Sequence, residues 1–473
     1  MRGAAITAGT TLPTRRAATF AAAMFAAAMF AAAMVAAAMF APGLLVLGLV
    51  LAALGMVLVL AWLHPVAAGT GWLLIVGSTP EMWLGDLLGP AFYQPIIAVE
   101  KGAGLALAAV AVLRFGLRRD WYNPGLAFVA MFVTGLAHGL YPGLGMAASL
   151  RSLLGSAAPY AFMFSRLSRG WARAVIRTTM LIPALAVAAG SALDLAGLRP
   201  LFVQSGGWRL GALGHPAFLG SFALAAIYAC LVELYRGGRP RDAALMALNF
   251  VILVLTGARA PLIYGVAVTG LTLAFVPSPA FPRRRRMLLL LGALALLPLA
   301  LGAAGSLSGL RLFNLLEHNP DALSGREQIW AWFERAAAGS PWVGWGVGAG
   351  NAVIPQDSRV VEIMHTWAAH NEYLRIAVEG GRLGEALLLA LFVLWAAAHT
   401  ARLPRGERAI MRLVFVAFAC HAATDNVLIS TSASVLFAFV AAVFARGALE
   451  ATAADRANGP ERGAGAGGAV GAR

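Results

Sequence analysis

Charged residues are scarce in this chain: they make up 12% of its 473 residues, whereas hydrophobic residues make up 60% and mean hydropathy is +0.77. A soluble protein of this length carries roughly a quarter charged residues, because its domains need polar surfaces. The scarcity therefore excludes a soluble enzyme. A membrane span needs about 20 apolar residues, and the chain has enough apolar sequence for many spans.

Cysteine and lysine are also rare. Cys230 and Cys420 both lie inside apolar runs, so they carry no information about the redox compartment. Lys101 is the only lysine, and the net charge of +15 therefore comes from arginine. The arginines stand in short clusters between apolar runs, where the positive-inside rule puts them. The charge thus indicates membrane topology, and no nucleic-acid partner is expected.

The apolar runs predict the fold class and the segments of the chain. We expect an all-α polytopic membrane protein with about 12 transmembrane helices, in contact with membrane lipids, and one long loop that carries short helices. A second apolar run directly follows the N-terminal repeat, which favours a retained anchor over a cleaved signal peptide. The predicted segments are a basic N-terminus with a low-complexity apolar repeat (residues 1–42), transmembrane helices (43–304), the loop with an interfacial helix (305–382), C-terminal transmembrane helices (383–446) and a disordered cytoplasmic tail (447–473).

Arginine clusters predict the orientation. Five clusters alternate with poorly charged connections, and the spans count consistently when all five are cytoplasmic. The long loop then lies on the opposite, outer side. The clusters are Arg114/Arg118/Arg119, Arg166/Arg169/Arg173, Arg236/Arg239/Arg241, Arg283–Arg286 and Arg402/Arg405/Arg408.

Further arginines fall on the outer side, against the positive-inside bias: Arg151, Arg209, Arg259 and Arg326. Each of them is either an anchor or the partner of a carboxylate such as Asp425, or else part of an anion site. Several on one face favour the anion site, because guanidinium is always charged and binds phosphate bidentately. A diphosphate at the membrane surface is the natural ligand.

His370 is the candidate base on this side. The stretch Asn371–Glu379 mixes apolar and polar residues as a short interfacial helix does, and Gly380-Gly381 breaks it. The positive end of the helix dipole favours a neutral imidazole, which can accept a proton as general base. The alternative is a histidine that only caps the helix.

Few other polar residues suggest chemistry. His421 and Asp425 are four apart near the outer end of a span, where they can pair with each other or with a site arginine. The histidines lack zinc-ligand spacing and the outer loop lacks a DxD-like pair of acidic residues, so we expect no metal and no cofactor. The glycine-rich stretch from Pro341 to Asn351 lacks a strand-to-helix context and is interpreted as a tight loop.

At these residues the chain resembles the O-antigen ligase/polymerase superfamily of bacterial envelope glycosyltransferases. The residues that match the family's ligase signature are His370 and Asn371, then nine residues from Glu372 to Gly380, then Gly381 and Gly384. The chain departs from the signature at the next position, Glu385. Further similarities to the family's segments lie at Arg209 with His215-Pro216, at Thr256–Arg259 with Ala258 in place of serine, and at Ser324–Arg326 with Pro341–Gly346.

The resemblance implies a metal-independent enzyme of the bacterial inner membrane with its loop and site facing the periplasm. An undecaprenyl-diphosphate-linked glycan is the donor, and lipid A–core is the acceptor of a ligase. His370 is then the catalytic base, Arg209 and Arg259 bind the diphosphate, and Arg151 and Arg326 assist. Supporting positions are Asn371, Gly381, Gly384, His421 and Asp425.

Three alternatives stay open. A polymerase of O-antigen or exopolysaccharide repeats has nearly the same site, but its acceptor is a lipid-linked glycan. A protein O-oligosaccharyltransferase usually carries a further C-terminal domain, which we do not expect here. A transporter of lipid-linked glycan needs arginines for the diphosphate but no base, and internal repeats typical of transporters are not seen.

Overall fold

The computed structural model describes residues 52–458 except 53, 54, 57, 60, 90, 91, 206, 303–325, 356 and 365. The chain divides into two compact units, Met1–Leu63 and His64–Arg473, and all elements named below lie in the second unit. The expected apolar repeat in residues 1–42 lies outside the described residues. The same is true of residues 305–325 of the expected loop and 459–473 of the expected tail.

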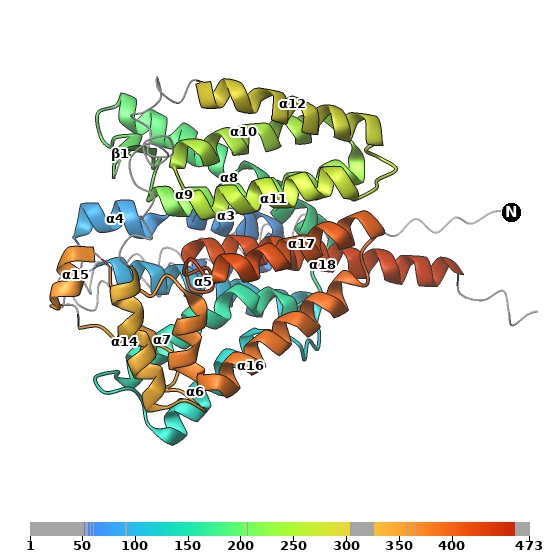
Figure 1. The fold of residues 1–473 in the computed structure, drawn as a ribbon. Helices are drawn as coiled ribbons and strands as arrows, with labels where there is room; N and C mark the ends of the chain where they lie inside the picture. The colour runs from blue at the N-terminus through green and yellow to red at the C-terminus, as the bar shows by residue number, and fades with distance from the viewer. Residues whose placement is uncertain are drawn as a thin grey trace, which may run out of the picture. The chain divides into compact units, whose positions relative to one another are not determined.

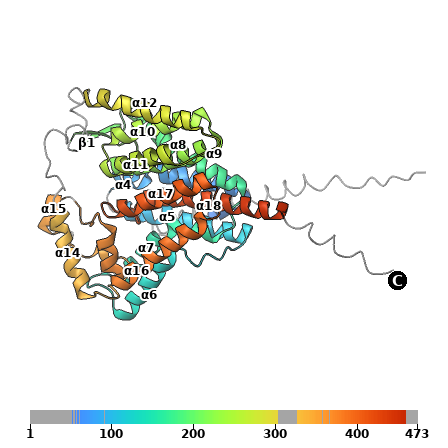
Figure 2. The ribbon, with the colours of Figure 1, turned by 45° about the vertical axis from the view of Figure 1, so that its right-hand side comes forward.

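Helices form most of the described second unit, as the apolar runs predict (Figures 1 and 2). Proline opens α3, α4, α9 and α10, because its fixed φ suits the first helical turn and it has no N–H to leave unpaired. The helices are α3 (Pro65–Gly77), α4 (Pro80–Leu88), α5 (Tyr93–Phe115), α6 (Gly125–His138), α7 (Met146–Ala157), η2 (Ala158–Phe164), α8 (Arg169–Leu195), α9 (Pro216–Gly237), α10 (Pro240–Thr256), α11 (Arg259–Phe275), α12 (Arg283–Gly302), α14 (Arg326–Gly339), η3 (Ala349–Asn351), α15 (Arg359–Met364), α16 (Glu372–Thr400), α17 (Arg405–Ala422) and α18 (Thr431–Asn458).

One small hairpin corrects the expectation of an all-α chain. Strands β1 (Phe202–Gln204) and β2 (Trp208–Leu210) pair antiparallel, with Val203 opposite Arg209. Gly207 has a φ of 114°, a value that a residue without Cβ adopts at little cost in the turn between the strands. The hairpin fixes the backbone of Arg209.

Among the described residues, five helices are long and apolar enough to cross a membrane: α5, α8, α9, α16 and residues Thr431–Asp455 of α18. Helices α3, α6 and α11 are apolar but shorter. The chain therefore has the character of a membrane protein. The total of about 12 spans and the periplasmic position of the loop stay predictions.

Residues 124–164 form α6, α7 and η2, because Gly139, Pro142, Gly143 and Gly145 interrupt the apolar sequence. One boundary differs from that expected. The tail expected to be disordered from residue 447 is helical to Asn458, since it is rich in alanine, the strongest helix former.

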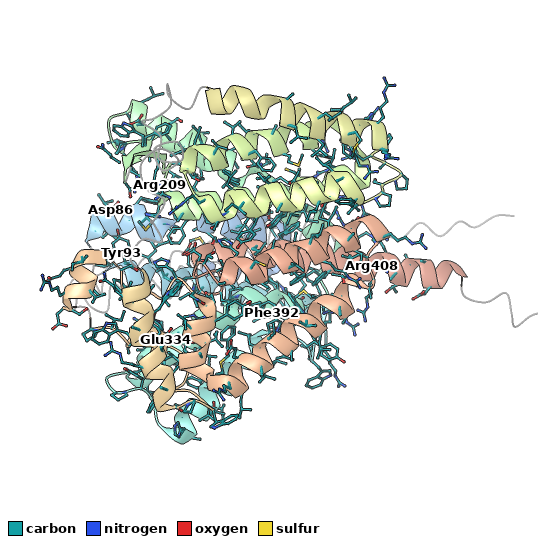
Figure 3. All side chains as sticks on the ribbon, viewed as in Figure 1. Asp86, Tyr93, Arg209, Glu334, Phe392 and Arg408 are labelled. Atoms are coloured by element: carbon teal, nitrogen blue, oxygen red, sulfur yellow. The ribbon has the colours of Figure 1, made fainter. Side chains whose placement is uncertain are left out.

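Arginine clusters that are far apart in sequence meet at one end of the helices. Leu117 and Ser165 form a β-bridge, which joins the cluster that contains Arg118 to the cluster that contains Arg166. Arg236 of a third cluster forms an ion pair of 2.7 Å with Glu407, which lies between Arg405 and Arg408 in the sequence. Figure 3 shows Arg408 at this end and Arg209 at the other. The structure thus separates the clustered arginines from Arg209, as the charge pattern predicts.

Candidate active site

Helix α16 begins with a short segment that a glycine separates from the long apolar part. Gly381 has a φ of 58° and a ψ of −166°, which interrupts the helix after Gly380. The loop from Pro341 to Gly346 pairs with the exposed backbone at this break: Trp345 N–H donates to Val378 O and Gly346 N–H to Glu379 O, both at 2.9 Å. The expected helix and its glycine break are therefore present.

The expected polar face of this segment is covered by other parts of the protein. Glu372, Arg375 and Glu379 are buried, because they turn toward α5, α7 and the loop before α18. Arg375 donates to Glu372 at 2.5 Å and to Glu379 at 2.7 Å. The sequence pattern correctly predicted that these three polar residues share one face of the helix, but it did not show which distant helices would cover that face.

His370 precedes this helix in a strained backbone conformation. Its φ is 47°, in the left-handed region that costs a residue with Cβ about 1–3 kcal/mol. On one side Asn371 caps α16, because its side chain accepts hydrogen bonds from Tyr373 N–H at 3.0 Å and Leu374 N–H at 3.3 Å. On the other side Ala369 is buried, and its carbonyl accepts from Trp330 Nε1 at 2.9 Å.

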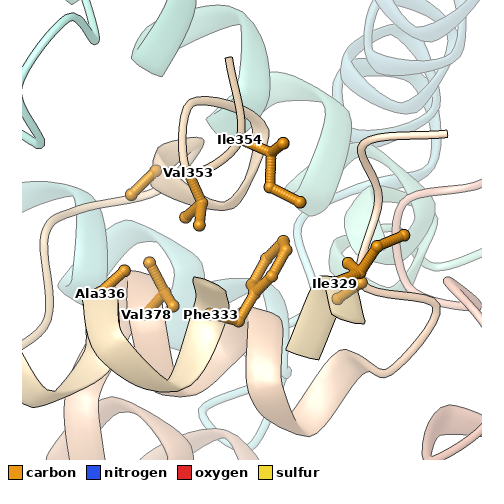
Figure 4. Close-up of a cluster of buried hydrophobic side chains, with 8 residues drawn as sticks. Ile329, Phe333, Ala336, Val353, Ile354 and Val378 are labelled. Atoms are coloured by element: carbon orange, nitrogen blue, oxygen red, sulfur yellow. The ribbon is translucent and has the colours of Figure 1, made fainter. Parts of the chain in front are cut away.

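A hydrophobic cluster holds Ala369 in place (Figure 4). It joins α14, the segment around η3 and the first turns of α16, so that these three elements form one packed unit. Strain at a polar residue between two fixed neighbours is typical of functional sites. The members are Ile329, Phe333, Ala336, Ala349, Val353, Ile354, Ala369 and Val378.

The His370 ring lies between a carboxylate and a hydroxyl. Nδ1 is 3.2 Å from Asp425 Oδ1 and Nε2 is 3.2 Å from Thr366 Oγ1. A carboxylate accepts but does not donate, so the hydrogen of the neutral ring belongs on Nδ1 and Nε2 is left as the acceptor. Both His370 and Asp425 are partly exposed, at 27% and 31% of their side-chain surface. Nε2 is thus the atom that can accept a proton from a substrate.

Asp425 lies in the turn between α17 and α18. Its burial raises the pKa, but the hydrogen bond with His370 and the charges of His421 and His370 outweigh this effect and hold the pKa below its ordinary value. His421 Nε2 is 3.8 Å from Asp425 Oδ2. This distance is too long for a hydrogen bond, and His421 Nε2 has no hydrogen-bond partner among the described residues, so the predicted pairing amounts to proximity of the two side chains.

His421 connects this group to α11. The rings of His421 and Tyr264 lie 5.2 Å apart, and Tyr264 is five residues after Arg259, the first residue of α11. At 1.5 Å per residue, Arg259 is about 7.5 Å further along the helix axis. Tyr264 thus links α11 to the His370 group through His421, and Arg259 lies on the same helix.

Arg209 is fixed against the turn before α11. Its Nε donates to Thr256 O at 2.8 Å, and its side chain is buried. Gly257 ends α10 with a φ of 61°, and the Thr256 hydroxyl accepts from Ala258 N–H at 3.2 Å, which turns the chain into α11. Arg209 and Arg259, predicted to act together, thus lie on either side of one turn.

Other expected site residues are elsewhere. Arg151 lies on α7 in a cavity with Lys101 and Arg375, and both ribbon views separate α7 from α10 by α11 and α17. Arg326 begins α14, but its side chain lies outside the described part of the chain. Gly384 packs close to Met131 of α6, where an added Cβ would be 2.9 Å from Met131 Cγ.

An apolar cavity of about 420 Å³ lies between α16 and α17. It runs from Glu372 and Tyr373, next to Asn371, to Arg412, and Leu388 and Ala419 are among the residues between. Within the described residues, no group of three or more His, Cys, Asp or Glu side chains is placed to hold a metal ion.

Sequence reasoning missed Lys101, Arg375 and Glu379 as site candidates. Lys101 carried a signal, because the only lysine of the chain stands in an apolar run, and charges in such runs are functional candidates by default. Thr366 was also missed, and it carried no signal in the sequence, because no sequence pattern shows that a threonine hydroxyl will contact a histidine ring.

Comparison with known proteins finds one family model that matches part of the chain. Residues 244–389 match the family model described as O-antigen ligase, and this segment includes α11, His370 and the break in α16. The resemblance to the O-antigen ligase superfamily is confirmed for this segment. The match supports a glycosyltransferase-like function of the ligase or polymerase kind, which acts on lipid-linked glycans. No curated protein matches the chain.

Proposed function

We propose that the chain is an O-antigen ligase-like glycosyltransferase that moves a glycan from undecaprenyl diphosphate to lipid A–core at the periplasmic face of the inner membrane. The observation that carries the proposal is the contact of His370 Nδ1 with Asp425 at 3.2 Å, which leaves Nε2 as a proton acceptor. A transporter does not need such a base, whereas transfer to a hydroxyl does.

His370 acts as the general base in this proposal. The acceptor hydroxyl takes the place of the Thr366 hydroxyl at Nε2 and gives its proton to the ring. Its oxygen forms the new bond to the anomeric carbon of the donor sugar, while the bond from that carbon to the diphosphate oxygen breaks. The ring becomes positively charged, and Asp425 stabilises it through Nδ1–H.

Arg209 and Arg259 neutralise the diphosphate that leaves. They lie at the N-terminus of α11, where backbone N–H groups and the helix dipole also favour an anion. Guanidinium groups stabilise charge that develops on a leaving phosphate without a metal ion. We assign Arg326 an assisting role, since it opens the helix that packs on α16.

The apolar cavity between α16 and α17 is the site we propose for the lipid chain of the donor. Its wall is almost entirely apolar, which suits a polyprenyl chain, and it begins beside Asn371, the neighbour of His370. A lipid bound there brings its diphosphate end to the level of the base.

A transfer assay tests the proposal. Purified protein receives undecaprenyl-diphosphate-linked glycan and lipid A–core, with and without EDTA. We expect glycan on lipid A–core at a rate that EDTA does not change. Growth of the glycan on its own lipid carrier instead assigns the polymerase function to the same site. Transfer to neither acceptor, in a preparation that binds the donor, contradicts both.

A second His–Asp pair offers the matched control. His399 Nε2 is 3.2 Å from Asp120 Oδ1, the same distance as in the His370 pair, but it lies at the other end of α16. We expect His370→Gln to abolish transfer and His399→Gln to reduce stability while transfer by the folded fraction continues. Equal loss in both variants indicates a structural role for His370.

A further inference from the structure

A second cavity, whose wall carries several charged side chains, lies on α7 and α5, elements that both ribbon views separate from α10 and the turn bonded to Arg209. It has a volume of about 840 Å³ and is enclosed by α5, α7, the segment around η3 and the first turns of α16. Trp367 and Ile429 are part of its wall, three residues from His370 and four residues from Asp425. The cavity therefore reaches the two segments that carry His370 and Asp425, although neither residue is part of its wall.

Charged side chains of both signs line this cavity. Lys101, Arg151 and Arg375 contribute positive charges, and Glu379 contributes a carboxylate. Glu372, Glu81 and Glu100 lie within electrostatic range of Lys101, so the cations are balanced and do not form a purely anion-binding site. Such a mixture of donors and acceptors suits a ligand with many hydroxyl groups.

Arg375 has a donor without a partner. Two of its nitrogens are bonded to Glu372 and Glu379, but Nη2 is buried and has no hydrogen-bond partner among the described residues. The side chain is only 5% exposed and lines the cavity. A buried donor on a charged group is costly to leave unsatisfied, and an oxygen of a bound ligand would satisfy it.

Two glycines create the space around these cations. A Cβ on Gly155 of α7 would be 3.2 Å from Lys101 Nζ, and a Cβ on Gly350 would be 2.7 Å from Arg375 Cγ. The absence of side chains at both positions lets α7 and the η3 segment approach the two cations. Asn351 and Trp367 complete the wall with an amide and an aromatic ring.

We propose that this cavity holds the sugar residues of the acceptor, with Lys101, Arg151 and Arg375 bonded to its oxygens. The inference rests on the proposed function, because it places the acceptor and the donor diphosphate on opposite sides of the base. The base must contact the acceptor hydroxyl, so the cavity that reaches the segment of His370 and lies away from Arg209 is the acceptor side. Arg151, predicted to bind the diphosphate, is a substrate-binding residue of the acceptor instead.

The single lysine makes the cavity directly measurable. In the full chain, reductive methylation modifies only Lys101 and the terminal α-amine, which serves as an internal reference. We expect the oligosaccharide of lipid A–core to slow the methylation of Lys101 several-fold and undecaprenyl diphosphate to leave it unchanged. Protection by undecaprenyl diphosphate alone, or by neither compound, overturns the proposal.

Kinetics give the second readout. We expect Arg151→Gln to raise KM for the acceptor about 10-fold, the scale of one hydrogen bond to a charged group, while KM for the donor and kcat stay the same. Arg335→Gln, an exposed arginine of α14, is the control and leaves both constants unchanged. A rise in the donor KM of Arg151→Gln overturns the proposal. Transfer without protection of Lys101 refutes the cavity alone, whereas protection without transfer refutes the proposed function alone.

Discussion

Asp425 is the residue whose substitution tests the geometry of the base most sharply. Asp425→Asn keeps the size of the side chain but removes the charge that faces His370 Nδ1. The amide can donate to Nδ1, which moves the ring hydrogen to Nε2 and blocks that nitrogen as a proton acceptor. The negative charge that stabilises the protonated ring is lost as well.

The structure sets the size of the effect. A hydrogen bond to a charged group contributes about 1.5–3 kcal/mol. Asp425 is 31% exposed, so solvent screens the charge and the lower part of that range, about 1.5–2 kcal/mol, applies. Lost from the transition state, this energy reduces kcat roughly 10- to 30-fold.

The assay is steady-state transfer by purified protein with both substrates varied. We expect kcat to fall while KM for donor and acceptor stays within about twofold, because Asp425 positions the base and touches neither substrate. Asp120→Asn is the control, since it removes the carboxylate from His399 at the same distance of 3.2 Å. An unchanged kcat in Asp425→Asn, or an equal fall in Asp120→Asn, refutes the reasoning.

Three further predictions concern the strained glycine, pH and the diphosphate site. Gly381→Ala puts a Cβ 2.4 Å from the Trp342 carbonyl carbon, at a φ of 58° that a residue with Cβ rarely adopts. Thermal unfolding should therefore show that the free energy of unfolding falls by at least about 2 kcal/mol. Gly270→Ala is the control, because Gly270 has open space around it, and it should be neutral or slightly stabilising. The lowered pKa of Asp425 means that its contribution to stability is complete above the ordinary carboxyl pKa of about 3.9 and is lost as pH falls through the folded value. The stability difference between wild type and Asp425→Asn should therefore shrink as pH falls below about 4; a difference that grows there contradicts the assignment. Arg209→Lys keeps the charge but loses the planar guanidinium, and KM for the donor should rise about 10-fold with the acceptor KM unchanged.

The sequence predicted those features that depend on local patterns. The apolar runs indicated helices, and the glycine pair after Glu379 predicted the break that the structure has at Gly381. The spacing of His421 and Asp425 predicted that the two side chains lie near each other, and Nε2 of the first is 3.8 Å from Oδ2 of the second. These features follow from helical periodicity and from the conformations that glycine allows.

Features that depend on distant packing could not be read from the sequence. The pattern showed that Glu372, Arg375 and Glu379 share a face, but it could not show that α5 and α7 cover this face and enclose a cavity. Arg151 was grouped with Arg209 because both lie on one side of the membrane in the predicted topology. The structure separates them, since position along the membrane normal says nothing about position within the plane.

His370 as the base of glycosyl transfer is the central claim, and kcat of His370→Ala measures it most directly. The assay uses lipid-linked glycan and lipid A–core at saturating concentrations, with donor binding measured on the same preparation. Loss of a general base lowers kcat by about 10²–10⁴, and binding of the donor should persist because the arginines are intact. A variant that binds the donor and transfers glycan at close to the wild-type rate contradicts the claim.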